Sequence, residues 1–135
     1  MSLEDEVQNR LVADTESILQ DNLDRVENLF QLHSDGTINI DEEYREVDPK
    51  LRVLIYLIAQ RFAHEGDLKD EDTLETRFFY ARIDRKESTI RNYLKSLRED
   101  GLVSKEGQSD YRVVVENLPE AIDRIQSADT AGEDE

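Results

Sequence analysis

Basic side chains are concentrated in one stretch of this chain, between Arg77 and Arg112. The stretch holds nine basic and six acidic residues, a net charge of +3, whereas the whole chain of 135 residues carries −16. The remainder of the chain therefore carries −19. An acidic protein that gathers its bases in one segment is expected to use that surface for an anion.

Side chains suited to reading DNA bases recur within this stretch. A helix over residues 85–99 would place five of them on or beside one face, opposite Leu94 and Leu97: Arg85, Ser88, Arg91, Asn92 and Lys95. The forked donors and acceptors of Arg and Asn match the edges of guanine and adenine in the major groove. We therefore expect these five residues to read bases. The alternative is a solvated helix face with i, i+4 ion pairs, such as Lys95 with Glu99.

Residue patterns for other chemistry are missing from the sequence. His33 and His64 lie in different segments, neither has an HExxH-type neighbour, and the chain has no Cys. There is also no glycine-rich phosphate loop and no nucleophile elbow. We therefore expect no enzyme activity, no metal and no cofactor.

The overall composition indicates adaptation to salt. The chain has 33 acidic residues spread along its length, and its bases are 12 Arg to only 5 Lys. A carboxylate-coated surface poor in lysine resembles the proteins of halophilic archaea, whose high salt screens self-repulsion. The alternative is an ordinary acidic protein of a low-salt cytoplasm. The longest apolar run, within Val53–Ala59, is too short to span a membrane, and the first residues lack signal-peptide features. We expect a soluble cytoplasmic protein.

The first quarter of the chain has the periodicity of one long amphipathic helix, over residues 4–33. Its apolar seam has spacings of 7, 4, 3 and 4, typical of a and d positions, and consists of Val12, Leu19, Leu23, Val26 and Phe30. A seam of this kind must be buried, so we expect residues 1–34 to form a dimerisation helix. The alternative is that the helix folds back on the core of its own chain.

Turn and capping signals divide the rest of the chain. Residues 35–47 contain a turn, a short strand at 37–41 and an acidic connector, and Asp48-Pro49 is typical of a helix start. That helix, which runs to about residue 63, is apolar nearly all round and is therefore expected at the centre of a domain. Capping-box spacing predicts two further helices, from Asp72 with Glu75 and from Asp84 with Glu87.

A β-hairpin and a last helix follow the 85–99 helix. Asp100-Gly101 is a C-cap of the left-handed type, and strands are expected at 102–105 and 111–115. Residues 119–127 predict a short helix. The small and acidic residues 128–135 predict a disordered tail.

Part of this order resembles a known family. Ser88-Thr89-Ile90, Leu94, Leu97 and Glu99-Asp100-Gly101-Leu102-Val103 are similar to the recognition helix and first wing strand of winged-helix transcription regulators. The resemblance covers roughly residues 48–115. Two positions depart from it: Phe78, Phe79 and Tyr80 stand where small residues are usual, and Asp84 stands where glycine is common.

The resemblance implies a fold and a function. The fold would be mainly α with a small β-hairpin, a winged helix-turn-helix domain at 48–127 behind the N-terminal helix. The function would be sequence-specific binding of double-stranded DNA by a homodimer, as in transcription regulation, with the third helix in the major groove and the hairpin wing on the backbone. By analogy, four residues would contact phosphate: Lys86, Thr89, Lys105 and Arg112. The alternative is a winged-helix protein-interaction module of a larger DNA-processing or chromosome-associated assembly.

Overall fold

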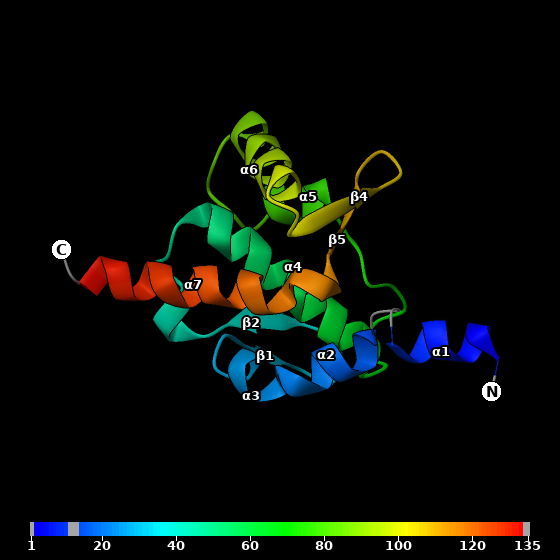
Figure 1. The fold of residues 1–135 in the computed structure, drawn as a ribbon. Coiled ribbons are helices and arrows are strands. Elements are labelled where there is room, and N and C mark those ends of the chain that lie inside the picture. The colour runs from blue at the N-terminus through cyan, green and yellow to red at the C-terminus, as the bar shows by residue number, and fades with distance from the viewer. Residues whose placement is uncertain (1, 11–13, 134–135) are drawn as a thin grey trace.

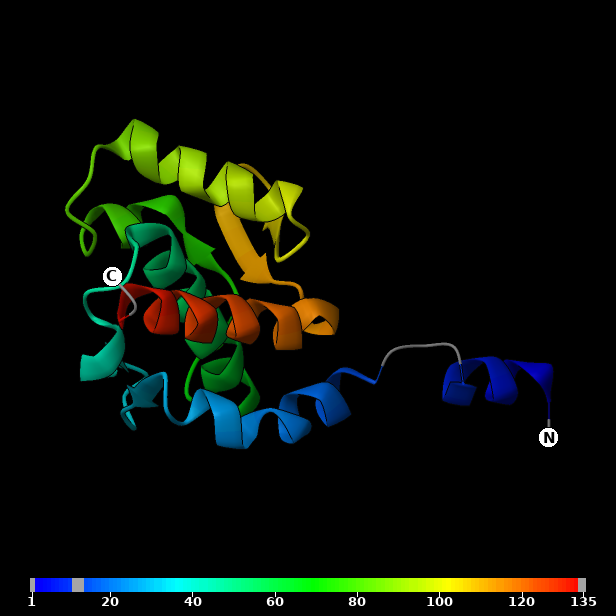
Figure 2. The same cartoon turned by 60° about the vertical axis from the view of Figure 1, so that its left-hand side comes forward.

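The protein is mainly helical with two small antiparallel sheets, as the computed structural model shows for residues 2–10 and 14–133 (Figures 1 and 2). The first half contains α1 (Leu3–Arg10), α2 (Thr15–Asp21), α3 (Leu23–Val26), β1 (Phe30–Leu32), β2 (Ile38–Ile40), the 3₁₀ turn η1 (Glu42–Tyr44) and α4 (Pro49–Glu65). The second half contains β3 (Leu74–Glu75), α5 (Thr76–Tyr80), α6 (Glu87–Glu99), β4 (Val103–Glu106), β5 (Asp110–Val113), η2 (Val115–Asn117) and α7 (Leu118–Glu133).

Helix α4 is the centre of the protein, as its apolar sequence predicts. The Asp48 carboxylate accepts a hydrogen bond from the Lys50 amide at 2.9 Å, and Pro49 occupies the first turn. Gly66 caps the other end. Buried residues lie on every side of the helix, which packs against β1 and β2, the hairpin strand β5, α6 and α7. Figure 1 shows α7 crossing in front of α4, with α6 above and the β1–β2 hairpin below.

Three strands form the sheet beside α5 and α6. Their order is β3-β5-β4, all antiparallel, with Val103 opposite Val113 and Leu74 opposite Tyr111. The hairpin predicted from the sequence is therefore present, shifted by one or two residues at its ends. The strand predicted at 37–41 is also present as β2, and its partner is β1.

The long N-terminal helix predicted for residues 4–33 is wrong. Asp14 caps a new helix, α2, and the side chain of Asn22 donates to the Ile18 carbonyl at 2.7 Å where α2 ends. Phe30 then enters β1 opposite Ile40. The apolar spacing that suggested one helix arises because two short helices and a strand each turn apolar residues inward.

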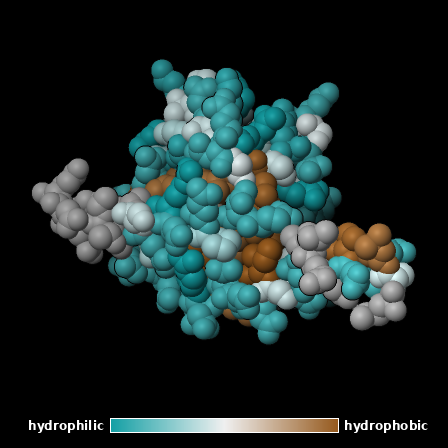
Figure 3. All heavy atoms as spheres, in the orientation of Figure 1, coloured by the Kyte–Doolittle hydropathy of each residue, from teal (hydrophilic) through white to brown (hydrophobic). Residues whose placement is uncertain are grey.

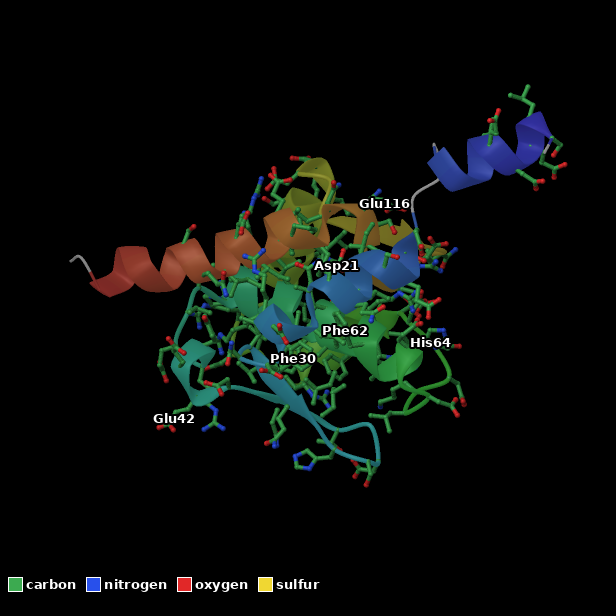
Figure 4. All side chains as sticks on the ribbon, turned by 60° about the horizontal axis from the view of Figure 1, so that its bottom comes forward. Asp21, Phe30, Glu42, Phe62, His64 and Glu116 are labelled. Atoms are coloured by element: carbon green, nitrogen blue, oxygen red, sulfur yellow. The ribbon has the colours of Figure 1, made fainter. Side chains whose placement is uncertain are left out.

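Most of the predicted dimer seam lies in the protein's own core. Leu19 and Val26 are each 3% exposed and Phe30 is 7% exposed, whereas Leu23 is 49% exposed. The Phe30 ring lies 6.4 Å from that of Phe62 in α4, and Figure 4 shows the two side by side. Val12, the remaining seam residue, lies outside the described residues. For Leu19, Val26 and Phe30 the fold-back alternative describes the structure.

Both capping-box predictions are also wrong. Leu74 and Glu75 form β3, because pairing with β5 buries Leu74, and the helix begins only at Thr76. The next helix begins at Glu87 with Lys86 at its N-cap position, and no side chain caps it. Asp84 and Arg85 belong to the preceding turn, in which the Arg85 amide donates to the Ile83 carbonyl.

Helix α6 ends at the cap that the sequence predicts, whereas helix α7 runs past its predicted end. Gly101 adopts φ +79°, and the amides of Gly101 and Leu102 donate to the carbonyls of Arg98 and Leu97. This is the left-handed cap that Asp100-Gly101 predicts. Helix α7 extends to Glu133, beyond residue 127, where the sequence predicted its end and the start of a disordered tail.

Candidate nucleic-acid interface

Helix α6 is held against the core by one apolar side. Ile90, Leu94 and Leu97 are fully buried and face α4 and α5. The amino group of Lys50, at the start of α4, donates to the Ser96 hydroxyl at 3.0 Å and adds a polar contact to this side. Because these contacts fix which side of α6 faces the core, the opposite side faces outward.

The outer side of α6 carries four of the five residues predicted to read bases. Ser88, Arg91, Asn92 and Lys95 are exposed. The guanidinium of Arg91 donates to the hydroxyl of Tyr80 in α5 at 3.2 Å. Arg85, the fifth, is exposed but precedes the helix, and its guanidinium donates to the Asp84 carbonyl at 2.6 Å. Ser88, Arg91, Asn92 and Lys95 thus lie on α6, as expected, whereas Arg85 lies before the helix and not on it.

The residues predicted to contact phosphate lie at both ends of this surface. Lys86 directly precedes α6 and is exposed, and Thr89 lies in the first turn of α6 and is partly buried. Lys105 is exposed on β4, with its amino group 5.9 Å from the centre of the Tyr111 ring. Arg112 is different, because its guanidinium lies 3.5 Å from Glu106 and 3.8 Å from Asp72. These carboxylates leave Arg112 less available to phosphate than the other three.

Two further bases belong to this surface and were missed from the sequence. Arg98 is exposed and lines a shallow hollow between α6 and β4 together with Lys95 and Lys105. Its spacing of three from Lys95 and seven from Arg91 would have placed it on the same face. Arg82, in the turn after α5, has its guanidinium 3.7 Å from the Phe78 ring centre. The spacing of four between Phe78 and Arg82 is the helical spacing that could have indicated this contact.

Ion pairing distinguishes this surface from the rest of the chain. Ion pairs with carboxylates are formed by Arg25, Arg61, Arg77, Arg112 and Arg124. In the described part of the chain, no ion pair is found for four arginines on or beside α5 and α6: Arg82, Arg85, Arg91 and Arg98. Lys95 has no ion pair with Glu99 within the described residues. The surface therefore presents uncompensated positive charge in a protein with an excess of carboxylates.

The N-terminal helices lie away from this surface. Figures 1 and 2 place α6 and the β4–β5 hairpin at one end of the protein and α1, α2 and α3 at the other. Figure 3 shows mostly hydrophilic atoms over the α6 end. The N-terminal helices that the structure describes therefore do not cover the outer side of α6.

Signs of other chemistry are few in the described part of the chain. Residues 2–10 and 14–133 contain no group of three or more His, Asp or Glu side chains placed to hold a metal ion. No helix in those ranges is long and apolar enough to cross a membrane. Comparison of the sequence with protein-family models, and of the protein with curated proteins and solved structures, finds no match.

Proposed function

We propose that this protein is a winged-helix protein that binds double-stranded DNA, with α6 in the major groove and the β4–β5 hairpin against the backbone. The observation that carries the proposal is the outer side of α6. It combines exposed Arg91, Asn92 and Lys95 with unpaired arginines, in a chain whose net charge is −16. Side chains of these types can donate to guanine and adenine edges from a helix lying in the groove.

The order of elements supports the winged-helix part of the proposal. A helix (α4), a short strand (β3), two helices (α5 and α6) and a hairpin follow one another, and β3 adds a third strand beside β5. The turn between α5 and α6 is six residues long by these bounds, from 81 to 86. This arrangement is similar to the winged helix-turn-helix that the residues from 88 to 103 resemble.

The bulky residues of α5 fit this arrangement through their packing. Phe79 is fully buried, and Phe78 packs edge-on against it and against Tyr56 of α4, with ring centres 5.4 and 5.3 Å apart. Tyr80 supplies the hydroxyl that holds Arg91. Aromatic side chains thus take the place of the small residues usual in the family without separating α5 from α6.

The salt concentration determines which contacts would contribute most to the DNA affinity of such a protein. A halophilic cytoplasm is the setting that we propose for this acidic chain. High salt weakens the contribution of counterion release to affinity. Binding would therefore depend more on base contacts by Arg91 and Asn92 than on bulk charge.

We also propose a homodimer, which would present two recognition helices. The dimer interface cannot be formed by Leu19, Val26 and Phe30, because these side chains are buried in the core of their own chain.

The salt dependence of DNA binding tests the proposal. Fluorescence anisotropy would give the affinity of the full chain for a labelled duplex at a series of KCl concentrations. We expect Lys86→Gln and Lys105→Gln to reduce the slope of log K against log salt by roughly 0.9 for each phosphate that the variant no longer neutralises. Arg61→Gln is the matched control, since it removes the same charge from α4, where Arg61 pairs with Glu65 at 3.2 Å.

Two outcomes would contradict the proposal. One is a duplex affinity so low that no binding is seen even at low salt with the chain folded. The other is a slope that changes as much in Arg61→Gln as in the two lysine variants. Either outcome would favour the alternative function, a protein-interaction module, over DNA binding.

A further inference from the structure

A pocket of about 390 Å³ lies where the β4–β5 hairpin meets α2, α4 and η2. That volume is at the lower end of the range for small-molecule sites, roughly 300–1,000 Å³. Helix α6 contributes none of the lining residues in the described part of the chain. The pocket is therefore separate from the outer side of α6, which is the surface proposed to read bases.

The pocket brings together side chains of both charge signs. Its two guanidinium groups come from α4 and β5, and its three carboxylates come from the loop before β3, from β4 and from η2. These five residues are Arg61, Arg112, Asp72, Glu106 and Glu116. Figure 4 shows Glu116 close to the first residues of α2, which packs against η2. Charges from four elements and a loop thus converge on one small volume.

The register of the hairpin determines the wall that carries Arg112. Ser104 lies opposite Arg112 across the two strands, and Glu106 lies two residues further along β4. Since side chains two residues apart share one face of a strand, Glu106 lies diagonal to Arg112 on the same face. The Val114 amide donates to the Leu102 carbonyl at 2.9 Å, so the pairing continues beyond β5. Val114 therefore lies beside Arg112 on this face.

Arg112 is not closely paired with either neighbouring carboxylate. Its Nε atom lies 3.5 Å from an oxygen of Glu106, and its Nη1 atom lies 3.8 Å from an oxygen of Asp72. A close pair in this protein, Arg124 with Asp100, has a distance of 2.7 Å. The Nε atom of Arg112 is also shielded from solvent and has no hydrogen-bond partner in the described structure. The guanidinium group therefore keeps donors for a further acceptor.

The mixture of charges determines which kind of ligand suits the pocket. A simple anion at Arg61 and Arg112 would be repelled by the three carboxylates, and a simple cation would be repelled by the two guanidinium groups. A zwitterion can place a carboxylate at the guanidinium groups and an ammonium group at the carboxylates. Each of its charges then meets an opposite charge and can form a charge-assisted hydrogen bond.

We propose that this pocket binds a free α-amino acid with an apolar side chain. Arg61 and Arg112 hold its carboxylate, because the planar donor fork of a guanidinium group matches that anion. Glu116 accepts hydrogen bonds from its ammonium group. The three valines at 113–115, which line the pocket, contact its side chain. The inference concerns a small molecule and stands without the proposed DNA binding.

NMR titration of the full chain tests this inference. Leucine, leucine methyl ester and N-acetylleucine would be added at constant KCl and about pH 6, where free amino groups are protonated. The ester lacks the carboxylate charge, and the acetylated compound lacks the ammonium charge. We expect a saturable shift of the Arg112 Nε–Hε cross-peak with leucine. Both derivatives should bind at least tenfold more weakly, because each leaves one set of pocket charges without a partner.

Variants assign the binding to this pocket, with affinities taken from backbone amide shifts of the hairpin. Arg112→Gln and Glu116→Gln should each weaken leucine at least tenfold. Arg77→Gln and Glu27→Gln remove the same charges from exposed positions outside the pocket and should leave the affinity unchanged. Glu116 is exposed, so its variant remains informative if Arg112→Gln fails to fold.

Three results would overturn the inference. The first is the lack of any saturable shift with leucine. The second is a derivative that binds as tightly as leucine, since the pocket would then not require both charges. The third is a Glu116→Gln variant that binds leucine like the unaltered chain.

Discussion

The guanidinium of Arg91 on α6 donates a hydrogen bond to the hydroxyl of Tyr80 on α5, at 3.2 Å. The contact joins the two helices on either side of the 81–86 turn, next to the surface proposed to meet DNA. It uses one N–H of a fork that has five, so donors remain for a base edge.

Removal of the Tyr80 hydroxyl should affect binding more than folding. We expect Tyr80→Phe to weaken binding to a preferred duplex by roughly 0.5–1.5 kcal/mol, because Arg91 loses the partner that positions it. The free energy of unfolding should change by less than about 0.5 kcal/mol, since the bond is exposed to solvent. Anisotropy and urea unfolding measure the two effects. Equal reductions in both would show a structural role only.

The corrected N-terminal segment predicts an asymmetry between Leu19 and Leu23. These residues are four apart in the sequence seam, but one is buried and the other about half exposed. Leu19→Ala should lower the free energy of unfolding by about 2–5 kcal/mol, and Leu23→Ala by less than roughly 1 kcal/mol. Urea unfolding of both variants at equal salt checks this. Similar reductions at the two positions would favour the continuous helix instead.

The cap of α4 gives a local test of the central helix. Asp48→Ala removes the acceptor of the Lys50 amide and should cost about 0.5–2 kcal/mol of stability. Asp48→Asn keeps a side-chain oxygen at the same place and is the matched control. Thermal unfolding of the two variants should separate them clearly. If both behave like the unaltered chain, the cap contributes nothing measurable.

Local signals in the sequence located the ends of α4 and the end of α6 better than they located the N-terminal elements. Asp48-Pro49, Gly66 and Asp100-Gly101 act through the backbone of a few neighbours, so each could be recognised without the fold. Strand β3 could not, because Leu74 and Glu75 become a strand only through pairing with β5, some 36 residues later. The N-terminal seam misled for a related reason, since Leu19, Val26 and Phe30 face one core from three different elements.

The candidate site, too, could be predicted from the sequence only where it depends on local structure. Helical spacing correctly grouped Ser88, Asn92 and Lys95, which depend only on α6 being a helix. It could not show that Arg85 falls before the helix, nor that Arg112 would pair with Glu106 and Asp72.

The proposed salt adaptation predicts how stability depends on ionic strength. At low salt the 33 carboxylates repel one another with little screening, and the folded state concentrates them. The thermal midpoint should therefore rise substantially between low and molar KCl. Circular dichroism melts over that range check the expectation. A midpoint that stays level or falls would remove the halophile proposal while leaving the fold unaffected.

Selection from a random duplex library in molar KCl tests the central claim most directly. The account predicts an enriched sequence motif for the unaltered chain. Arg91→Ala or Asn92→Ala should then cost on the order of 1–3 kcal/mol at that motif and relax the preference for the contacted base. Lys105→Ala should instead weaken all sequences alike. Recovery of no motif, or duplex binding that is indifferent to Arg91 and Asn92, would contradict the proposal that α6 reads DNA.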